Sequence, residues 1–208
     1  MPLDLAALEA ELKKRLAEPY AAWGAKQTDG WDQSTNFIYH APTWADLKRR
    51  LVEAPADLRN YAINRWFNYW SAVGVEAIFC GMPEVAAARD PKDRLVDFHI
   101  RGIPFDHKTS VYPRGFPLLL EFARCHPQFL VEWLYRKQSG ERRWHAANRL
   151  FLVLYDTSPE AMHWKLRAEL GLIRLAVHQY LAAFDPARLV RLEVEGQTVL
   201  SDVVWVVR

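Results

Sequence analysis

Two aspartates, a histidine and a lysine alternate with apolar residues in the stretch Arg94–Ser110, RLVDFHIRGIPFDHKTS. The alternation runs on both sides of Arg101-Gly102, a pair suited to a two-residue turn, so the sequence predicts a β-hairpin. In this register Asp97 stands directly opposite Asp106, with the two Cα atoms roughly 4.5 Å apart. The spacing therefore predicts that two carboxylates meet on one face of the hairpin.

The predicted hairpin has one apolar face and one charged face. The apolar face consists of Val96, Phe98, Ile100, Ile103 and Phe105, and the charged face consists of Asp97, His99, Asp106 and Lys108. Like charges directly opposite each other destabilise a sheet by some tenths of a kcal/mol up to about 1 kcal/mol. Lys108 could compensate, as could Mg²⁺ or Mn²⁺, which favour oxygen ligands. An ordinary Asp-Lys pair on a surface hairpin is the alternative, although covering segments on both sides favour a cleft.

The rest of the chain predicts a mixed α/β fold in one domain, 1–208, with a helical and loop extension over 1–55, a core over 56–156, and a helix and strand pair over 157–208. A polar loop is predicted over 24–42, and Thr43 is predicted to cap a short helix. The other predicted helices are Leu3–Leu16, Ala56–Phe79, Phe116–Lys137 with a break near Pro127, and Ser158–Phe184. The other predicted strands are Val85–Ala88, Arg149–Tyr155, Leu189–Val194 and Val199–Val207.

Composition excludes several classes of protein. The 208 residues are 50% hydrophobic with a formal net charge of +2, so the chain has enough apolar residues for a core and no overall basic field for nucleic acid. Two cysteines far apart favour neither a disulfide scaffold nor a thiolate zinc site, and they suit a reducing compartment. Without a signal-peptide core or an apolar run of the ~20 residues that span a bilayer, we expect a cytoplasmic protein with no membrane partner.

At these residues the chain resembles the PD-(D/E)xK nuclease superfamily, whose fold many restriction endonucleases share. Asp97, Asp106 and Lys108 match the motif in order, spacing and predicted strand position, and Glu76 matches the glutamate of the preceding helix. The likeness covers about Ala56–Tyr155. Val96 stands where the name-giving proline would be, a residue that the family often lacks.

The resemblance implies a restriction-endonuclease-like mixed central sheet flanked by helices, here with an N-terminal helical extension. It also implies a Mg²⁺-dependent nuclease, with Mn²⁺ as a substitute, that hydrolyses phosphodiester bonds in nucleic acid and acts as a DNA endonuclease. Asp97, Asp106 and Glu76 would hold the metal and Lys108 would be the catalytic cation. A homodimer that cuts two strands fits such a small domain. The rival interpretations are a non-catalytic nucleic-acid-binding or interaction module with the same fold, and a phosphohydrolase acting on nucleotides.

Several other residues have both a functional and an ordinary interpretation. Glu76 could equally be a solvent-facing helix residue, with Glu84 as the fallback ligand. His99 could contact substrate or hydrogen-bond a ligand, but we interpret it as an ordinary polar strand residue, and we interpret His107 as structural. Thr109 and Ser110 supply hydroxyls beside the motif that could contact nucleic acid. Arg142 and Arg143, next to Trp144, could do so as well, or they could lie in a solvated loop.

Overall fold

The computed structural model describes residues 3–19, 29–88, 90, 95–138 and 147–208, and it divides the chain into two compact units. The first unit comprises residues 1–77 and 167–171, and the second comprises residues 78–166 and 172–208. The boundary falls within the long helix α4, Ala56–Cys80. Within the described ranges, no helix has the length and apolar character needed to span a bilayer.

The first unit is helical. It contains α1 (Leu5–Lys14), the 3₁₀ helix Arg15–Ala17, α2 (Asp29–Ser34), the 3₁₀ helix Asn36–His40, α3 (Trp44–Arg50) and most of α4. The core includes Trp66 of α4, whose indole N–H donates to the carbonyl oxygen of Ala41 at 2.6 Å. Thr43 caps α3 as predicted, because its hydroxyl accepts from the Asp46 N–H at 3.1 Å.

The predicted loop over 24–42 is wrong for its second part, since residues 29–34 and 36–40 are helical. These short helices are held by distant side chains of α4. The Arg65 guanidinium donates to the carbonyl oxygen of Asp32 at 2.7 Å and to the Tyr39 hydroxyl at 2.7 Å. Contacts made between segments far apart in sequence leave no local hydrophobic period, so the sequence pattern could not indicate these helices.

The second unit is built on a mixed six-stranded sheet in the order β1-β2-β3-β4-β6-β5. The strands are β1 (Val85–Ala87), β2 (Phe98–Ile100), β3 (Ile103–Val111), β4 (Arg149–Tyr155), β5 (Val190–Val194) and β6 (Gln197–Val207). β3 is parallel to β4 and β4 is parallel to β6, whereas the remaining pairs are antiparallel. The predicted α/β class and the strands are confirmed.

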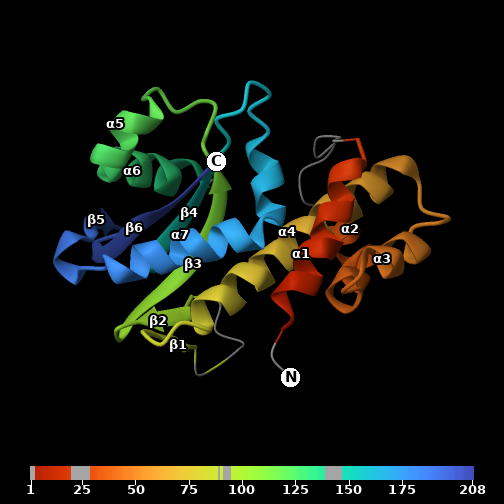
Figure 1. The fold of residues 1–208 in the computed structure, drawn as a ribbon, viewed down its shortest axis with the longest axis horizontal. Helices are drawn as coiled ribbons and strands as arrows, with labels where there is room; N and C mark the ends of the chain where they lie inside the picture. Colours follow the sequence, from red (N-terminus) through yellow and green to blue (C-terminus); the bar gives the residue numbers. More distant parts are fainter. Residues whose placement is uncertain (1–2, 20–28, 89, 91–94, 139–146) are drawn as a thin grey trace. The chain divides into compact units, whose positions relative to one another are not determined.

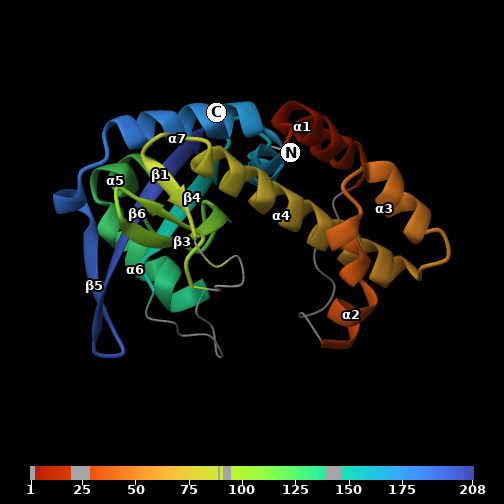
Figure 2. The same ribbon diagram turned by 90° about the horizontal axis from the view of Figure 1, so that it is seen from below.

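Helices lie on both faces of this sheet, as Figures 1 and 2 show. On one face, α5 (Leu120–Cys125) and α6 (Pro127–Gln138) pack over β4, β5 and β6, and this core includes Leu130, Phe151 and Val203. On the other face lies α7 (Leu170–Ala182). The helix predicted from Ser158 begins later, because residues 163–168 form a 3₁₀ helix before α7. β4 is buried over six of its seven residues, as its apolar run predicts.

The β2–β3 hairpin has the predicted register, with Phe98 paired to Phe105 and Ile100 to Ile103. Its turn residues have positive φ, 48° at Arg101 and 85° at Gly102, which is the backbone of a two-residue hairpin turn. Phe98, Ile100 and Phe105 are fully buried, and Phe98 stacks on Phe79 with ring centroids 4.5 Å apart. The apolar face of the hairpin therefore faces a core, as predicted.

β3 changes partner along its length. Its first residues pair with β2, and from Asp106 onward it pairs in parallel with β4, where Asp106 lies beside Arg149. The Asp106 N–H donates to the carbonyl oxygen of Asn148 at 2.9 Å, and the Asp97 N–H donates to that of Phe105 at 2.8 Å. Asp97 and Asp106 thus lie where the hairpin ends and the parallel sheet begins.

Candidate functional site

Asp106 is the centre of the charged cluster at this junction. Its side chain is only 9% exposed, and each carboxylate oxygen contacts a cation. The Lys108 ammonium donates to Oδ1 at 2.5 Å, and Nε of Arg149 lies 3.7 Å from Oδ2. Lys108 and Arg149 differ in exposure, because the Lys108 side chain is 44% exposed whereas that of Arg149 is 8% exposed. The cluster therefore has one cation directed to its surface and one inside.

Asp97 does not occupy the predicted position opposite Asp106 in the ladder. β2 begins at Phe98, and the Asp97 carboxylate turns toward His107. Oδ2 of Asp97 accepts from the His107 N–H at 2.7 Å and lies 2.7 Å from Nδ1 of the same residue. Since a carboxylate can only accept, the second contact places a proton on Nδ1. The predicted cross-strand pair is wrong, because the carboxylate satisfies a buried backbone N–H where β3 leaves β2.

The charge of Asp97 nevertheless acts on the Asp106 carboxyl group. Burial raises the pKa of Asp106, and the charge of Asp97 raises it further, so the pKa lies above its usual range although Lys108 and Arg149 lower it. Burial also raises the pKa of Asp97, but the hydrogen bonds and charge of His107 outweigh burial and hold that pKa below its usual range. The pKa of Asp106 is thus raised and that of Asp97 is lowered, so Asp97 ionises at a lower pH than Asp106.

Arg149 is the residue of this cluster that the sequence interpretation missed. Its guanidinium carbon lies 5.0 Å from the centre of the Tyr135 ring, and its carbonyl oxygen accepts from the Ser201 hydroxyl at 2.6 Å. The Tyr135 hydroxyl donates to the carbonyl oxygen of Ala147 at 3.0 Å. A signal was present, because an arginine that opens an otherwise apolar buried strand needs an anionic partner.

His107 lies on the apolar side, as predicted. It is 8% exposed and its ring is stacked 5.9 Å from that of Phe98. His99 pairs with Pro104 in the hairpin and is half-buried. It lines a cavity of about 720 Å³ that runs along β1 and includes Glu84 and Asp90. His99 thus lines the cavity, whereas His107 packs in the core and orients the Asp97 carboxylate.

The remaining predicted site residues that the structure describes, Glu76, Thr109 and Ser110, lie on α4 and β3. Glu76 is exposed on α4, within the first unit, and its charge contributes to raising the pKa of Tyr69. Its metal role stays a prediction, and its exposure agrees with the alternative of a solvent-facing helix residue. Thr109 and Ser110 are half-buried on β3, and the Ser110 hydroxyl donates to the carbonyl oxygen of Val111 at 3.1 Å. Arg142 and Arg143 lie outside the described residues.

The donor set at the junction is suited to only some metals. Across the described ranges, no group of three or more His, Cys, Asp or Glu side chains could hold a metal ion. Asp97 and Asp106 are the two carboxylates at this junction that could supply protein ligands. This set fits Mg²⁺, which is commonly held by one or two carboxylates while it keeps water and phosphate ligands, and it does not fit zinc. An ion bound to Asp106 has to compete with Lys108 and Arg149 for the carboxylate oxygens.

The Asp97–His107 contact predicts a pH-dependent loss of stability in Asp97→Asn. Asparagine keeps an acceptor oxygen but loses the charge, so the variant should lose about 1 kcal/mol at neutral pH. The folded pKa of Asp97 is lowered, so its contribution is present above the unfolded pKa and is lost as pH falls through the folded pKa. The melting temperatures of wild type and variant should therefore start to converge only below about pH 4, the ordinary pKa of an aspartate, and meet below the folded pKa of Asp97.

Asp202 offers a matched control for this experiment. Burial raises the pKa of its carboxyl, so ionisation of Asp202 in the folded protein costs stability as pH rises. Asp202→Asn should therefore show no loss of stability at neutral pH. A difference between Asp97→Asn and wild type that persists unchanged into acid would contradict a charged Asp97–His107 contact.

Comparisons of the chain with protein-family models, with curated proteins and with solved structures find no match.

Proposed function

We propose that the protein is a metal-dependent nuclease that hydrolyses phosphodiester bonds, with Mg²⁺ as cofactor and DNA as substrate. The observation that carries the proposal is the contact between Asp106 and Lys108, two residues apart on the strand after the hairpin, with the charge of Asp97 acting on Asp106. Two carboxylates that can hold a metal ion and a lysine that can stabilise negative charge are residue types suited to metal-assisted phosphodiester hydrolysis.

Each residue has a distinct role in this proposal. Asp97 and Asp106 would supply the carboxylate oxygens that hold the ion. The chemistry of such an ion is Lewis acidity, which lowers the pKa of water and offsets charge on the phosphate. Lys108 is exposed enough to approach a phosphate oxygen while it remains in contact with Asp106, so its ammonium can orient water and stabilise negative charge in the transition state. His107 would hold the Asp97 carboxylate in place through two contacts.

A restriction-endonuclease-like fold is part of the same proposal. In its support, α4 precedes β1, the hairpin carries Asp97 at its start and Asp106 and Lys108 on β3, and α5 and α6 lead to the apolar strand β4. This is the element order of the superfamily resemblance. The parallel pairing of β3 with β4 places Arg149 beside Asp106, and so ties the motif to the centre of the sheet.

One observation favours the alternative of a non-catalytic nucleic-acid-binding or interaction module. Lys108 and Arg149 already neutralise Asp106 from both sides, and His107 occupies one oxygen of Asp97. Such a cluster could be purely structural. The two functions differ in their metal dependence and in the consequence of losing Lys108.

Cleavage by Lys108→Ala separates them. Removing one group that stabilises charge in the transition state costs about 10²- to 10³-fold in rate, so we expect the variant to lose cleavage by that factor while it stays folded. The assay uses labelled DNA with Mg²⁺, and circular dichroism checks the fold. Lys165→Ala is the matched control, because Lys165 is a half-buried lysine of the same unit outside the cluster. Full activity in folded Lys108→Ala would rule out Lys108 as the catalytic cation.

A further inference from the structure

The edge strand β5 has a sequence that can pair with itself. β5 is the last strand in the sheet order, with β6 as its one neighbour among the strands of the described chain. It reads Val-Arg-Leu-Glu-Val from Val190 to Val194, without proline or glycine, and its pairing with β6 is continuous. Of the features by which natural proteins protect exposed edges, this strand has charged side chains, Arg191 and Glu193, but neither a proline nor a bulge in its pairing with β6.

Arg191 and Glu193 stand one residue before and one residue after Leu192, so the charge pattern of the strand is centred on Leu192. If a second copy of β5 adds antiparallel with Leu192 opposite Leu192, each Arg191 stands opposite the Glu193 of the other copy. Val190 then stands opposite Val194. Opposite charges that face each other across an antiparallel pair stabilise it, whereas like charges destabilise it. The strand is thus complementary in charge and in apolar character to its own antiparallel copy.

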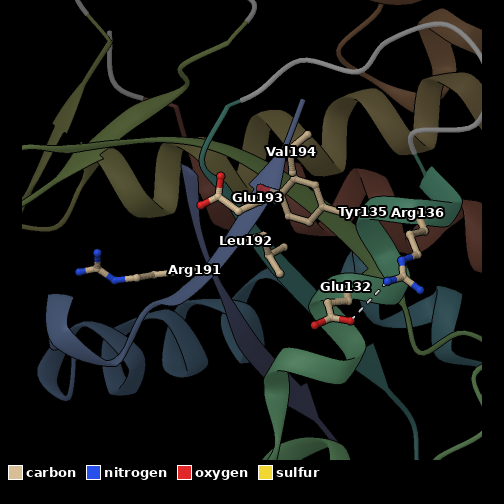
Figure 3. A pocket seen from close by; sticks show the side chains of 7 residues that line it. All are labelled: Glu132, Tyr135, Arg136, Arg191, Leu192, Glu193 and Val194. Carbon is tan, nitrogen blue, oxygen red and sulfur yellow. Dashed lines mark ion pairs between the residues drawn. The ribbon is translucent and has the colours of Figure 1, made fainter. Parts of the chain in front are cut away.

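The side chains of β5 are sorted between its two faces, as Figure 3 shows. Leu192 and Val194 lie toward Tyr135 of α6, whereas Arg191 and Glu193 point to the other side. Arg191 and Glu193 are exposed. The Glu193 carboxylate accepts from the Thr198 hydroxyl of β6 at 2.6 Å, which holds it along the sheet, and Arg191 has no ion-pair partner within the described part of the chain. An exposed cation and an oriented carboxylate therefore stand one residue on either side of Leu192.

The backbone geometry agrees with this pairing. Val194 and Gln197 flank the two-residue turn Glu195-Gly196, whose φ angles are 50° and 75°. The two residues that flank such a turn direct their backbone N–H and C=O groups at each other. Along each strand of an antiparallel pair, residues then alternate between directing these groups toward the partner strand and directing them away from it. The backbone groups of Arg191 and Glu193 are therefore directed away from β6. In the register that places Arg191 opposite Glu193 of a second copy, these outward-directed N–H and C=O groups can hydrogen-bond to that copy.

A groove beside β5 could receive apolar side chains of the added strand. It has a volume of about 310 Å³ and lies between β5 and α6, lined by Leu192, Val194 and Tyr135 with charged residues at its rim. Glu132 and Arg136, one turn apart on α6, form an ion pair at 3.7 Å on the helix side of that rim. Val190 and Leu192 are only partly buried against the core beneath. The Leu192 side chain of a second copy would cover this partly exposed apolar surface.

We propose that the protein forms a two-fold symmetric dimer in which the β5 strands of two copies pair antiparallel about Leu192. The sheets of the two second units then join into one continuous sheet. A two-fold interface uses the same patch on both copies, which is the symmetry of the β5 sequence. The dimer does not depend on the nuclease proposed above.

Charge exchange at the two positions tests this register. Arg191→Glu places like charges opposite each other twice in the dimer, and so does Glu193→Arg, so each variant should dimerise about 10- to 100-fold more weakly than wild type. When the two variants are mixed, position 191 of each copy again faces an opposite charge at position 193 of the other copy. The mixture should therefore form a mixed dimer about as stable as that of wild type. The double variant Arg191→Glu/Glu193→Arg should dimerise by itself.

Sedimentation velocity of the full chain over a wide range of protein concentration measures each association, and circular dichroism checks that each variant is folded. Arg174→Glu is the control, since it changes the charge equally at an exposed position of α7. A wild-type protein that stays monomeric, a dimer that resists both single variants, or single variants that weaken association without recovery on mixing would each overturn the proposal. Loss of nuclease activity would leave these results unaffected.

Discussion

Asp106→Asn is expected to abolish metal-dependent cleavage and to weaken Mn²⁺ binding by tenfold or more. Asparagine keeps the size of the side chain but cannot supply a charged oxygen ligand. Metal catalysis stabilises the transition state by several kcal/mol, and each ~1.4 kcal/mol is tenfold in rate, so the loss of cleavage should be about 10³-fold. Isothermal titration with Mn²⁺ and a cleavage assay measure the two effects.

Asp202→Asn is the matched control for this substitution. Asp202 is also a largely buried aspartate of the same sheet, and burial raises the pKa of its carboxyl as it does for Asp106. It follows Ser201, the neighbour of Arg149 in the ladder, and so points to the opposite face of the sheet. Folded Asp106→Asn that binds Mn²⁺ as wild type does would contradict the ligand role of Asp106.

The raised pKa of Asp106 adds a pH dependence to the same experiment. Only the ionised carboxyl binds a metal ion well, so affinity falls as pH drops through the pKa of this group. Because that pKa lies above its usual range, Mn²⁺ affinity should start to fall at a higher pH than an ordinary aspartate would give. Asp97, whose pKa is lowered, would stay ionised to a lower pH and should not set this limit.

The second large effect concerns stability. Arg149→Met should lower the free energy of unfolding of the sheet by about 3 kcal/mol, because it leaves the buried Asp106 carboxylate with one cation in place of two. Methionine keeps an apolar chain against Tyr135, so the loss reports mainly on charge. Hydrogen exchange in peptides from β4 measures the stability of this part of the sheet.

Two further variants show whether the loss arises from an unpaired buried charge. Asp106→Asn/Arg149→Met removes both charges and should recover most of the stability, since replacing a buried ion pair costs little. Lys108→Ala removes a half-exposed cation and should cost less than about 1 kcal/mol. If Lys108→Ala destabilises the sheet as much as Arg149→Met does, the distinction between an interior structural cation and an outer catalytic one is wrong.

Much of the second unit could be predicted because its signals are local. The turn at Arg101-Gly102 and the alternation beside it fix the hairpin register, and the run from Arg149 to Tyr155 marks a strand covered on both faces. These features depend on residues that are close together in the sequence, so they can be predicted without knowing which distant segments come into contact. Asp106 and Lys108 could be placed together for the same reason, since alternate residues of a strand share a face.

What the sequence could not predict depends on contacts between distant segments. The sequence of the hairpin does not indicate that β3 changes its partner strand at Asp106. Because of that change, the Asp97 carboxylate contacts His107, and Asp97 does not pair with Asp106 across the strands. Arg149 reaches Asp106 only because β3 and β4 pair in parallel in one particular register. The helices at 29–34 and 36–40 are likewise held by side chains of α4.

The most direct test of the central claim is cleavage of labelled single- and double-stranded DNA and RNA by the wild-type chain. Each substrate is incubated with Mg²⁺, with Mn²⁺ and with EDTA, beside Asp106→Asn and Asp202→Asn. If the protein is a metal-dependent nuclease, the wild type should cleave with either ion, and DNA should be cleaved better than RNA. There should be no cleavage with EDTA or by Asp106→Asn, and Asp202→Asn should cleave as wild type does. Cleavage that persists in EDTA, or folded wild-type protein that cuts none of the substrates with either ion, would contradict it.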